Sequence, residues 1–439
     1  MSHEHFHSVI LEEDKCIGCT NCIKRCPTEA IRVKDGKAKI IKERCVDCGE
    51  CIRICPQHAK NAITDPIDTI GRFQYKIALP APSLLGQFDE TAAEPAKILS
   101  ALKEIGFDEV FEVSRGADIV SHYTGELLKN PKALPLISSS CPAIVRIIQI
   151  RFPTLIENIA PIESPMEIAA KIAREKAAVK TGLDPKEIGI FFISPCAAKM
   201  TSVKSPLGQE VSNVDGVIAI RDVYPLIKKN IKKVENYPDF YDSGKGIGWA
   251  RAGGETLSLG IKAYLGVDGI ENVIKILDEI ENEQLKDIQY VECLACINGC
   301  VGGPLTVENS FVARNRIRRL SEKYPQKKEL NLNQSIKEFL FTRQILSKDI
   351  GKLDDDLIAA IEKMEKIDDI YEQLPKLDCG ACGSPTCRSL AEDIVLGFSN
   401  LDDCIVLFRD KVKHLLAQNQ EHSENPPEQN TAQETNFEK

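Results

Sequence analysis

The sequence has no run of 18 apolar residues, and residues 1–15 are polar and His-bearing instead of forming a charged region followed by an apolar one. These two absences argue against a membrane span and an export signal, so we expect a cytoplasmic protein with no membrane partner. An excess of positive charge is missing as well. The formal net charge is -9, which argues against a nucleic-acid partner.

Cysteine, in contrast, is abundant, with 17 residues in a chain of 439. Disulfides are rare in a reducing compartment, so metal binding is the better interpretation of so many thiols. Sixteen of the cysteines fall into the groups described below, and Cys293 is left over. For Cys293 we expect a small packed thiol, with a second-sphere or redox role as the alternative.

The first cysteine group is a C-x2-C-x2-C-x3-C-P run that occurs twice, which is the spacing of two-cluster ferredoxins. In such runs the fourth cysteine binds the cluster of the other run. The first predicted [4Fe-4S] cluster has Cys16, Cys19, Cys22 and Cys55, and the second has Cys45, Cys48, Cys51 and Cys26. Zinc ribbons are the alternative, but they give no reason for the doubled triplet. Residues 1–68 are therefore predicted to form a small α+β ferredoxin-like domain.

Strand-like and helix-like segments alternate between residues 72 and 345. The predicted strands are 75–80, 110–113, 134–137, 188–193, 214–220 and 288–291, and the predicted helices are 96–106, 143–152, 166–181, 222–230 and 270–281. This alternation predicts an α/β domain with a mostly parallel sheet and helices on both of its faces.

Three loops of this α/β domain carry cysteines just after predicted strands. Cys141 and Cys196 each follow an apolar run, and residues 292–300 hold three thiols, Cys293, Cys296 and Cys300. Ligands of open α/β sheets gather beyond the carboxyl ends of strands, so we expect these cysteines to converge on one site. Taken alone, Cys141 or Cys196 could equally be an inert buried thiol. The three thiols at residues 292–300 favour metal binding for Cys141 and Cys196.

Residues 138–142, 194–199 and 292–303 resemble the three signature motifs of the [FeFe]-hydrogenase catalytic domain, and Gly253 and Gly254 resemble a glycine turn of that family. The resemblance covers roughly residues 75–343. It implies an H-cluster, in which a [4Fe-4S] cube is joined to a two-iron unit that carries CO, cyanide and an azadithiolate. The ligands of the cube would be Cys141, Cys196, Cys296 and Cys300.

The same resemblance implies roles for individual residues. Cys300 would also bridge to the two-iron unit, and Lys199 would donate charge-assisted hydrogen bonds to a cyanide ligand. The implied reaction is the reversible conversion of H2 into protons and electrons, with the electrons relayed through the [4Fe-4S] clusters. Implied partners are a redox protein, either ferredoxin-like or signalling, and the H-cluster maturation proteins.

Several positions depart from the pattern of fast members of that family. Ser140, the third residue we expect in the catalytic site, stands where these members have a proton-relaying cysteine, and a hydroxyl is a poor relay. Residues 117–124 lack the glutamates of the usual proton path, and Ala160 and Pro161 replace a serine pair. Ser194 and Leu294 stand at positions where many members have methionines around the two-iron unit.

These departures resemble the sensory branch of the family, in which slow turnover serves hydrogen or redox sensing. Two alternatives stay open, namely a metabolic ferredoxin-linked hydrogenase and a non-catalytic iron-sulfur assembly or redox factor without the two-iron unit. The proton path could be rerouted through Glu126, His122 or water.

A heptad seam of apolar residues marks the predicted helical linker at 346–375. Its members are Leu353, Leu357, Ala360, Met364, Ile367, Tyr371 and Leu374. We expect a helix that packs on its own domain, with a homodimer helix as the alternative.

The last cysteine group, Cys379, Cys382, Cys387 and Cys404, has the spacing C-x2-C-x4-C-x16-C. It resembles the small [4Fe-4S] domain at the end of sensory hydrogenases and predicts a small helical domain at 376–416 with one [4Fe-4S] cluster. Zinc is the alternative metal, because it accepts the same four thiolates. Residues 417–439 are rich in Gln, Asn, Glu and Pro and are expected to be disordered.

Overall fold

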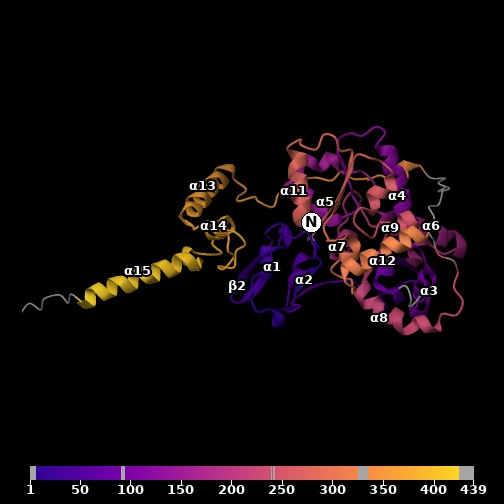
Figure 1. Ribbon diagram of the computed structural model, residues 1–439, viewed down its shortest axis with the longest axis horizontal. Coiled ribbons are helices and arrows are strands. Elements are labelled where there is room, and N and C mark those ends of the chain that lie inside the picture. The colour runs from indigo at the N-terminus through magenta and orange to yellow at the C-terminus, as the bar shows by residue number, and fades with distance from the viewer. Residues whose placement is uncertain (1–5, 90–93, 239, 241–242, 325–334, 425–439) are drawn as a thin grey trace, which may run out of the picture. The chain divides into compact units, whose positions relative to one another are not determined.

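The computed structural model describes residues 6–89, 94–238, 240, 243–324 and 335–424. The chain divides into two compact units (Figure 1). The first contains Met1–Ile31 and Asp35–Gly351, so the predicted ferredoxin-like and α/β segments share one unit. The second contains Arg32–Lys34 and Lys352–Lys439. Among the described residues, none of the helices is both long and apolar enough to span a membrane.

The N-terminal segment repeats one short structural unit, as its two cysteine runs do. Its strands are β1 (Val9–Leu11), β2 (Ile31–Lys34), β3 (Lys37–Ile40) and β4 (Lys60–Ala62), and its helices are α1 (Asn21–Lys24) and α2 (Glu50–Ile54). Strands β1 and β4 pair antiparallel. Each helix begins after a residue in the left-handed region, Thr20 with φ 61° and Gly49 with φ 74°. Each helix thus holds the third cysteine of its run.

The α/β domain contains two separate parallel sheets. One has the order β6-β5-β8-β9, and the other has the order β10-β11-β7. The strands are β5 (Tyr75–Pro80), β6 (Glu109–Val110), β7 (Leu136–Ile137), β8 (Ile188–Ser194), β9 (Gly216–Ala219), β10 (Tyr264–Asp268) and β11 (Tyr290–Leu294). We expected one sheet. The expectation was wrong because the two-residue strand β7 pairs only with β11 within the described sheets.

The predicted strands agree with the structure best where they are long. Strand β5 has the predicted bounds, and β8 extends one residue further. The predicted strand at 110–113 was wrong, since β6 ends at Val110 and a helix begins at Val113. Strand β10 was missed because its sequence, Tyr264–Asp268, is interrupted by Gly266 and ends in Asp268, so its apolar run is short.

Helices cover the strands of this domain (Figure 1). They are α3 (Pro95–Ser100), α4 (Val113–Leu127), α5 (Pro142–Arg151), α6 (Pro165–Thr181), α7 (Ala197–Lys204), α8 (Ile220–Asn230), α9 (Gly244–Gly248), α10 (Gly254–Leu259), α11 (Ile270–Glu281) and α12 (Ser310–Lys323). A proline at the first position begins α3, α5 and α6, where its fixed φ favours the helix and its missing N–H costs nothing. Short 3-10 helices include Ile67–Arg72, Pro82–Gln87, Pro153–Asn158 and Cys300–Gly302.

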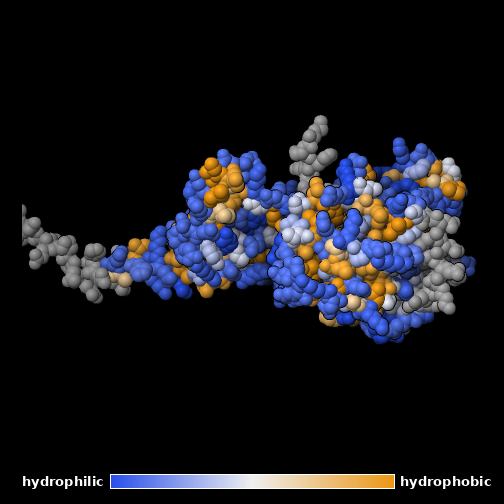
Figure 2. Space-filling model, turned by 90° about the horizontal axis from the view of Figure 1, so that it is seen from above, coloured by the Kyte–Doolittle hydropathy of each residue, from blue (hydrophilic) through white to orange (hydrophobic). Residues whose placement is uncertain are grey.

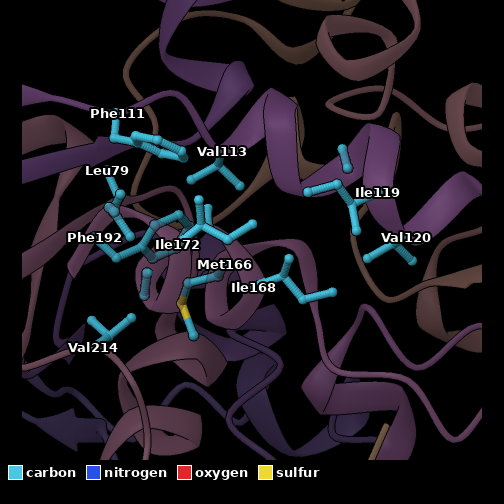
Figure 3. Close-up of a cluster of buried hydrophobic side chains, with 14 of the residues drawn as sticks. Leu79, Phe111, Val113, Ile119, Val120, Met166, Ile168, Ile172, Phe192 and Val214 are labelled. Carbon is cyan, nitrogen blue, oxygen red and sulfur yellow. The ribbon is translucent and has the colours of Figure 1, made fainter. Parts of the chain in front are cut away.

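Figure 3 shows how one part of the core is assembled. Leu79 from β5 and Phe192 from β8 lie beside Met166 and Ile172 from α6, and Val120 comes from α4. All five side chains are at least 91% buried. The helices are therefore fixed to the four-stranded sheet by apolar burial, at roughly 25 cal/mol per Å² of apolar area.

The second unit contains α13 (Leu357–Gln373), α14 (Cys387–Val395) and α15 (Ile405–Glu424). The heptad seam of α13 divides into two halves. Ile367 and Leu374 are buried in a cluster with Leu390, whereas Leu357 and Met364 are 75% and 50% exposed. Packing on its own domain therefore accounts for the C-terminal half of the seam.

The predicted disordered tail begins too early, because α15 continues to Glu424. The polar composition at 417–424 still allows a helix, since Ala417 and Gln418 are good helix formers that extend the turn before them. Residues 425–439 lie outside the described part of the chain.

Candidate metal centre

Four cysteines from three loops line one cavity of about 100 Å³ in the α/β domain. Cys141 lies between β7 and α5, Cys196 lies between β8 and α7, and Cys296 and Cys300 follow β11. The loops meet because each one leaves the carboxyl end of a parallel strand. The structure thus brings together all four cysteines predicted for the cube.

The thiols of this cavity are close enough that the charge on one changes the pKa of the others. Burial, together with negative charge on Cys296 and Cys141, raises the pKa of Cys196 to about 12. Burial also raises the pKa of Cys300 well above its usual value, again with a contribution from the other three cysteines. Four thiolates this close repel one another unless a cation binds them. The donor set therefore fits an iron-sulfur cluster.

Two further predicted site residues, Lys199 and Ser140, line the same cavity. The positive charge of Lys199 on α7 lowers the pKa of Cys196 and of Cys300, against the larger effect of burial. The Oγ atom of Ser140 is buried and has no hydrogen-bond partner among the described residues, while its backbone N–H donates to Ser138 Oγ at 3.2 Å. An unpartnered buried hydroxyl in a cavity wall is available to a bound group.

Leu294 and Ser194, the two residues predicted to replace methionines, lie in different surroundings. Leu294 lines the cavity. Ser194 is fully buried, and its Oγ accepts a hydrogen bond from the backbone N–H of Cys196 at 3.0 Å. Ser194 therefore fixes the loop that carries a cysteine.

Two buried glutamates, Glu255 and Glu292, line the cavity and were missed by the sequence analysis. Glu255 accepts hydrogen bonds from Ser138 Oγ at 2.8 Å and from Tyr290 Oη at 2.5 Å. Burial raises the pKa of both carboxyls, and the charge of Glu292 raises that of Glu255 further. A carboxylate inside the buried run Tyr290–Leu294 was the signal that could have identified Glu292.

Glu292 itself is held at the start of α10. It accepts hydrogen bonds from the backbone N–H of Gly253 at 3.0 Å and of Thr256 at 2.9 Å. The glycine turn singled out in the sequence thus positions a carboxyl of the cavity.

The residues suggested for a rerouted proton path are not brought to this cavity. Neither Glu126 nor His122 is among the described residues that line it. Glu126 is exposed and paired with Lys129 at 2.6 Å. Cys293 is fully buried in β11 but is not among the described lining residues either, and burial raises its pKa far above the usual value. It packs as a small apolar side chain.

The ferredoxin-like segment holds a second group of cysteines. Cys26, Cys45, Cys48 and Cys51 line one small cavity of about 20 Å³, so the last cysteine of the first run lies with three cysteines of the second. Burial raises the pKa of Cys22, and negative charge on Cys19 and Cys16 contributes to the same increase. These three thiols are therefore also neighbours.

Backbone N–H groups already point at some of these sulfurs. Ala30 donates to Cys26 Sγ at 3.2 Å, and Ala59 donates to Cys55 Sγ at 3.3 Å. Such N–H···S bonds stabilise thiolates that bind a cluster.

The last cysteine group, at the C-terminal end of the chain, lies in the second unit. Burial raises the pKa of Cys382, and charges on Cys404 and Cys379 would raise it further, so these thiols are close. Cys387 begins α14, and its backbone N–H donates to Asp378 Oδ1 at 2.6 Å. The turn between the cysteines needs glycine, because Gly380 and Gly383 have φ values of 71° and 88°.

Comparison with known families covers most of these segments. Residues 74–265 and 254–304 match the family of the iron-only hydrogenase large subunit, C-terminal domain. Residues 8–56 match a 4Fe-4S dicluster domain, and residues 374–406 match an Fe-S cluster domain.

Individual relatives are distant. Over 378 residues the chain is 25% identical to iron hydrogenase 1 of Clostridium pasteurianum, which covers 68% of this chain and 65% of that protein, just under two thirds of its length. Over 363 residues it is 26% identical to the large subunit of the periplasmic [Fe] hydrogenase of Nitratidesulfovibrio vulgaris, with 68% and 86% covered.

A solved [FeFe]-hydrogenase structure that reveals stepwise H-cluster assembly is similar in fold. It superposes with a TM-score of 0.50 and 18% identity, over 65% of this chain and 97% of that chain. At this identity the likeness concerns the fold alone. The α/β domain with its parallel sheets, the ferredoxin-like segment before it and the small Fe-S segment after it agree with the predicted fold class, which is confirmed.

Proposed function

This chain belongs to the family of the iron-only hydrogenase large subunit, and from that premise we propose that it converts H2 reversibly into protons and electrons at an H-cluster. The observation that carries the proposal is the meeting of Cys141, Cys196, Cys296 and Cys300 with Lys199 around one cavity. This set supplies four thiolates for a [4Fe-4S] cube and a cation beside them.

The residues of the cavity suit the H-cluster in a specific way. When bound, the cluster supplies redox-active iron with CO and cyanide ligands for the chemistry of dihydrogen. Cys300 would bridge the cube and the two-iron unit, and the ammonium group of Lys199 would donate charge-assisted hydrogen bonds to cyanide. The walls are otherwise largely apolar, including Phe192, Met166 and Leu294, and such walls exclude water.

The groups in this cavity that could move protons are the hydroxyl of Ser140 and the carboxyls of Glu255 and Glu292. Ser140 holds a proton tightly, because the pKa of a hydroxyl is far above that of a thiol, so we expect it to pass protons slowly. Glu255 and Glu292 lie in the same wall, and their raised pKa values keep a carboxyl proton available near neutral pH. We propose that protons leave through this pair at a low rate.

Slow turnover suits a sensor better than a metabolic enzyme. We therefore propose that this chain reports on H2 or redox state in the cytoplasm, and that a ferredoxin-like or signalling protein takes its electrons. The two ferredoxin-type clusters would relay electrons, and the [4Fe-4S] cluster of Cys379, Cys382, Cys387 and Cys404 would act as output or as a second electron port. H-cluster maturation proteins would have to supply the two-iron unit.

Hydrogen assays test this proposal. Protein loaded with the two-iron unit should reduce a viologen dye with H2 slowly, and Cys300→Ala should abolish the activity while the ferredoxin-type clusters stay in place. Rates equal to those of fast hydrogenases would contradict the sensory role and favour a metabolic ferredoxin-linked enzyme. Activity absent from the loaded wild type would favour the assembly-factor alternative.

A further inference from the structure

An arginine from the ferredoxin-like segment reaches into the ligand set of the α/β domain. Arg53, in α2 between Cys51 and Cys55, donates through Nη1 to Cys296 Sγ at 3.2 Å. The same Nη1 atom donates to the backbone carbonyl of Gly302 at 3.3 Å. Its Nη2 atom is paired with Glu50 one turn earlier in α2. The guanidinium is thereby aimed at a cysteine that the α/β domain contributes.

The position of Arg53 is fixed by neighbouring contacts between the same two segments. Thr201 Oγ1 in α7 donates to Asp47 Oδ2 at 2.7 Å, and Ser8 Oγ donates to the carbonyl of Ala197 at 2.9 Å. Gly49 at the start of α2 lies against Pro304, since a Cβ atom on Gly49 would stand 2.5 Å from Pro304 Cγ. The start of α2 is thus packed tightly against the loop that follows Cys300.

Nothing in the cysteine spacing requires an arginine at this point. The other cysteine run has Arg25 near the matching place, and its Nη1 donates to Glu271 Oε1 at 2.9 Å on an exposed surface. Arg53 has a partly buried side chain, 25% exposed, and its donor faces a thiol sulfur. Two arginines in similar positions of a repeated fold therefore have different partners.

We propose that Arg53 is a positioning residue that raises the reduction potential of the cube held by Cys141, Cys196, Cys296 and Cys300, and so favours transfer of an electron from a ferredoxin-type cluster to the cube. In this step the cube gains one electron and one ferredoxin-type cluster loses one, with no bond made or broken. The added electron increases negative charge on the thiolate sulfurs. A charged N–H donor on Cys296 stabilises that charge more in the reduced than in the oxidised state.

This inference rests on the proposed function, because it assumes that the four cysteines hold a cube. It goes beyond it by assigning the tuning of that cube to a residue of a different segment. The ferredoxin-like segment would then do more than carry electrons. Its packing on the α/β domain would also set the reduction potential of the cube.

The test is a redox titration followed by electron paramagnetic resonance on the full chain that carries its [4Fe-4S] clusters without the two-iron unit. The signal of the cube is the one lost in Cys141→Ala. In Arg53→Gln we expect the midpoint of this signal to move to lower potential, by roughly a tenfold change in the one-electron equilibrium, or ~59 mV. Arg53→Lys keeps the charge, so its midpoint should lie between those of Arg53→Gln and the wild type.

The matched control is Arg25→Gln, which removes the same charge from the other cysteine run and should leave the midpoint of the cube unchanged. Equal midpoints in the wild type and Arg53→Gln would overturn the proposal, as would equal shifts in Arg53→Gln and Arg25→Gln. If Arg53→Gln folds poorly, a wild-type midpoint in Arg53→Met, which also removes the charge, overturns it instead. A wild-type spectrum from which Cys141→Ala removes nothing would overturn both this inference and the proposed function.

Discussion

Ser140 is the residue whose chemistry most directly limits the proposed reaction. Its hydroxyl lies in the wall of the cysteine-lined cavity without a hydrogen-bond partner among the described residues. Ser140→Cys would put a thiol there, whose pKa is closer to neutral, so we expect hydrogen turnover to rise by about tenfold or more. Viologen-linked assays at saturating H2 measure the change.

A neighbouring serine provides the control for Ser140→Cys. Ser139 Oγ donates to the carbonyl of Ile162 at 2.7 Å, and Ser139 is not among the described residues that line the cavity. Ser139→Cys should therefore leave the rate unchanged. Identical rates in the wild type and Ser140→Cys would show that the slow proton step lies elsewhere, for example at Glu255.

Glu163 makes the stability of the chain depend on pH. Burial, together with the charge of Glu167, raises its pKa to about 7, and its Oε2 has no hydrogen-bond partner among the described residues. The folded state therefore binds this proton more tightly than the unfolded state. The resulting stability is complete below the unfolded pKa and is lost as the pH rises through about 7.

Glu163→Gln should remove this dependence. At pH 8 we expect the variant to be more stable than the wild type by about 2 kcal/mol, and at pH 5 the difference should shrink. Melting temperatures at the two pH values measure it. A difference that is the same at both pH values, or larger at pH 5, would contradict the assigned cause.

Residues of the site divide clearly into those that sequence could identify and those that it could not. Cys141 and Cys196 were predicted to converge because each follows a predicted strand, whereas Lys199 was predicted only from the resemblance to the hydrogenase motifs, and the structure places all three on one cavity. Glu255 and Arg53 could not be identified, because only tertiary packing brings a helix start and a different segment to the cavity and to Cys296.

At the scale of elements, α4 and α6 pack with almost no room between them. A Cβ atom on Gly116 in α4 would lie 2.1 Å from the carbonyl oxygen of Pro165, at the start of α6. Gly116→Ala should therefore destabilise the chain by about 2 kcal/mol or more, as overpacked sites do. Denaturant unfolding measures the loss.

The same helix contains a control for this substitution. Gly125 also lies in α4, but an added Cβ would meet nothing within 4 Å. Gly125→Ala should stabilise by roughly 0.5–1 kcal/mol through helix propensity. Equal effects of the two substitutions would contradict close packing as the cause.

The exposed half of α13 presents a hydrophobic face, visible in Figure 2 as orange surface on the part of the chain that holds α13 in Figure 1. Leu357, Ile358, Ile361 and Met364 are between 45% and 75% exposed. Apolar faces of this kind often mark interfaces, and we propose that it joins two copies of this chain.

Light scattering at micromolar concentration tests the homodimer. The wild type should have the mass of a dimer, and Leu357→Glu with Ile361→Glu should weaken association by at least about tenfold, because charge is then placed in an apolar contact. Glu362→Gln, an exposed change on the same helix, should leave the dimer intact. A monomeric wild type would end this proposal.

Elements were predictable from sequence where one apolar pattern dominates. The helix at 270–281 has the predicted bounds, and α6 begins one residue early because Pro165 can occupy its first position. The segment 110–113 was ambiguous because four residues carry too little periodicity to separate a strand end from a helix start. The division into two sheets depends on pairing between distant strands, which no local pattern records.

At the scale of the whole molecule, the chain distributes its three cysteine-bearing segments over two compact units. The ferredoxin-like and α/β segments share one compact unit, and the C-terminal Fe-S segment belongs to the other unit together with α13. The proposed electron relay within the first unit can therefore be examined separately from the proposed output through the second. Both depend on whether the central cavity holds the H-cluster.

Infrared spectroscopy of protein loaded with the two-iron unit tests that claim most directly. Bound CO and cyanide absorb where protein does not, so the wild type should show their bands, Lys199→Ala should shift the cyanide bands, and Cys300→Ala should lack the set. A loaded wild type without CO and cyanide bands would contradict the account.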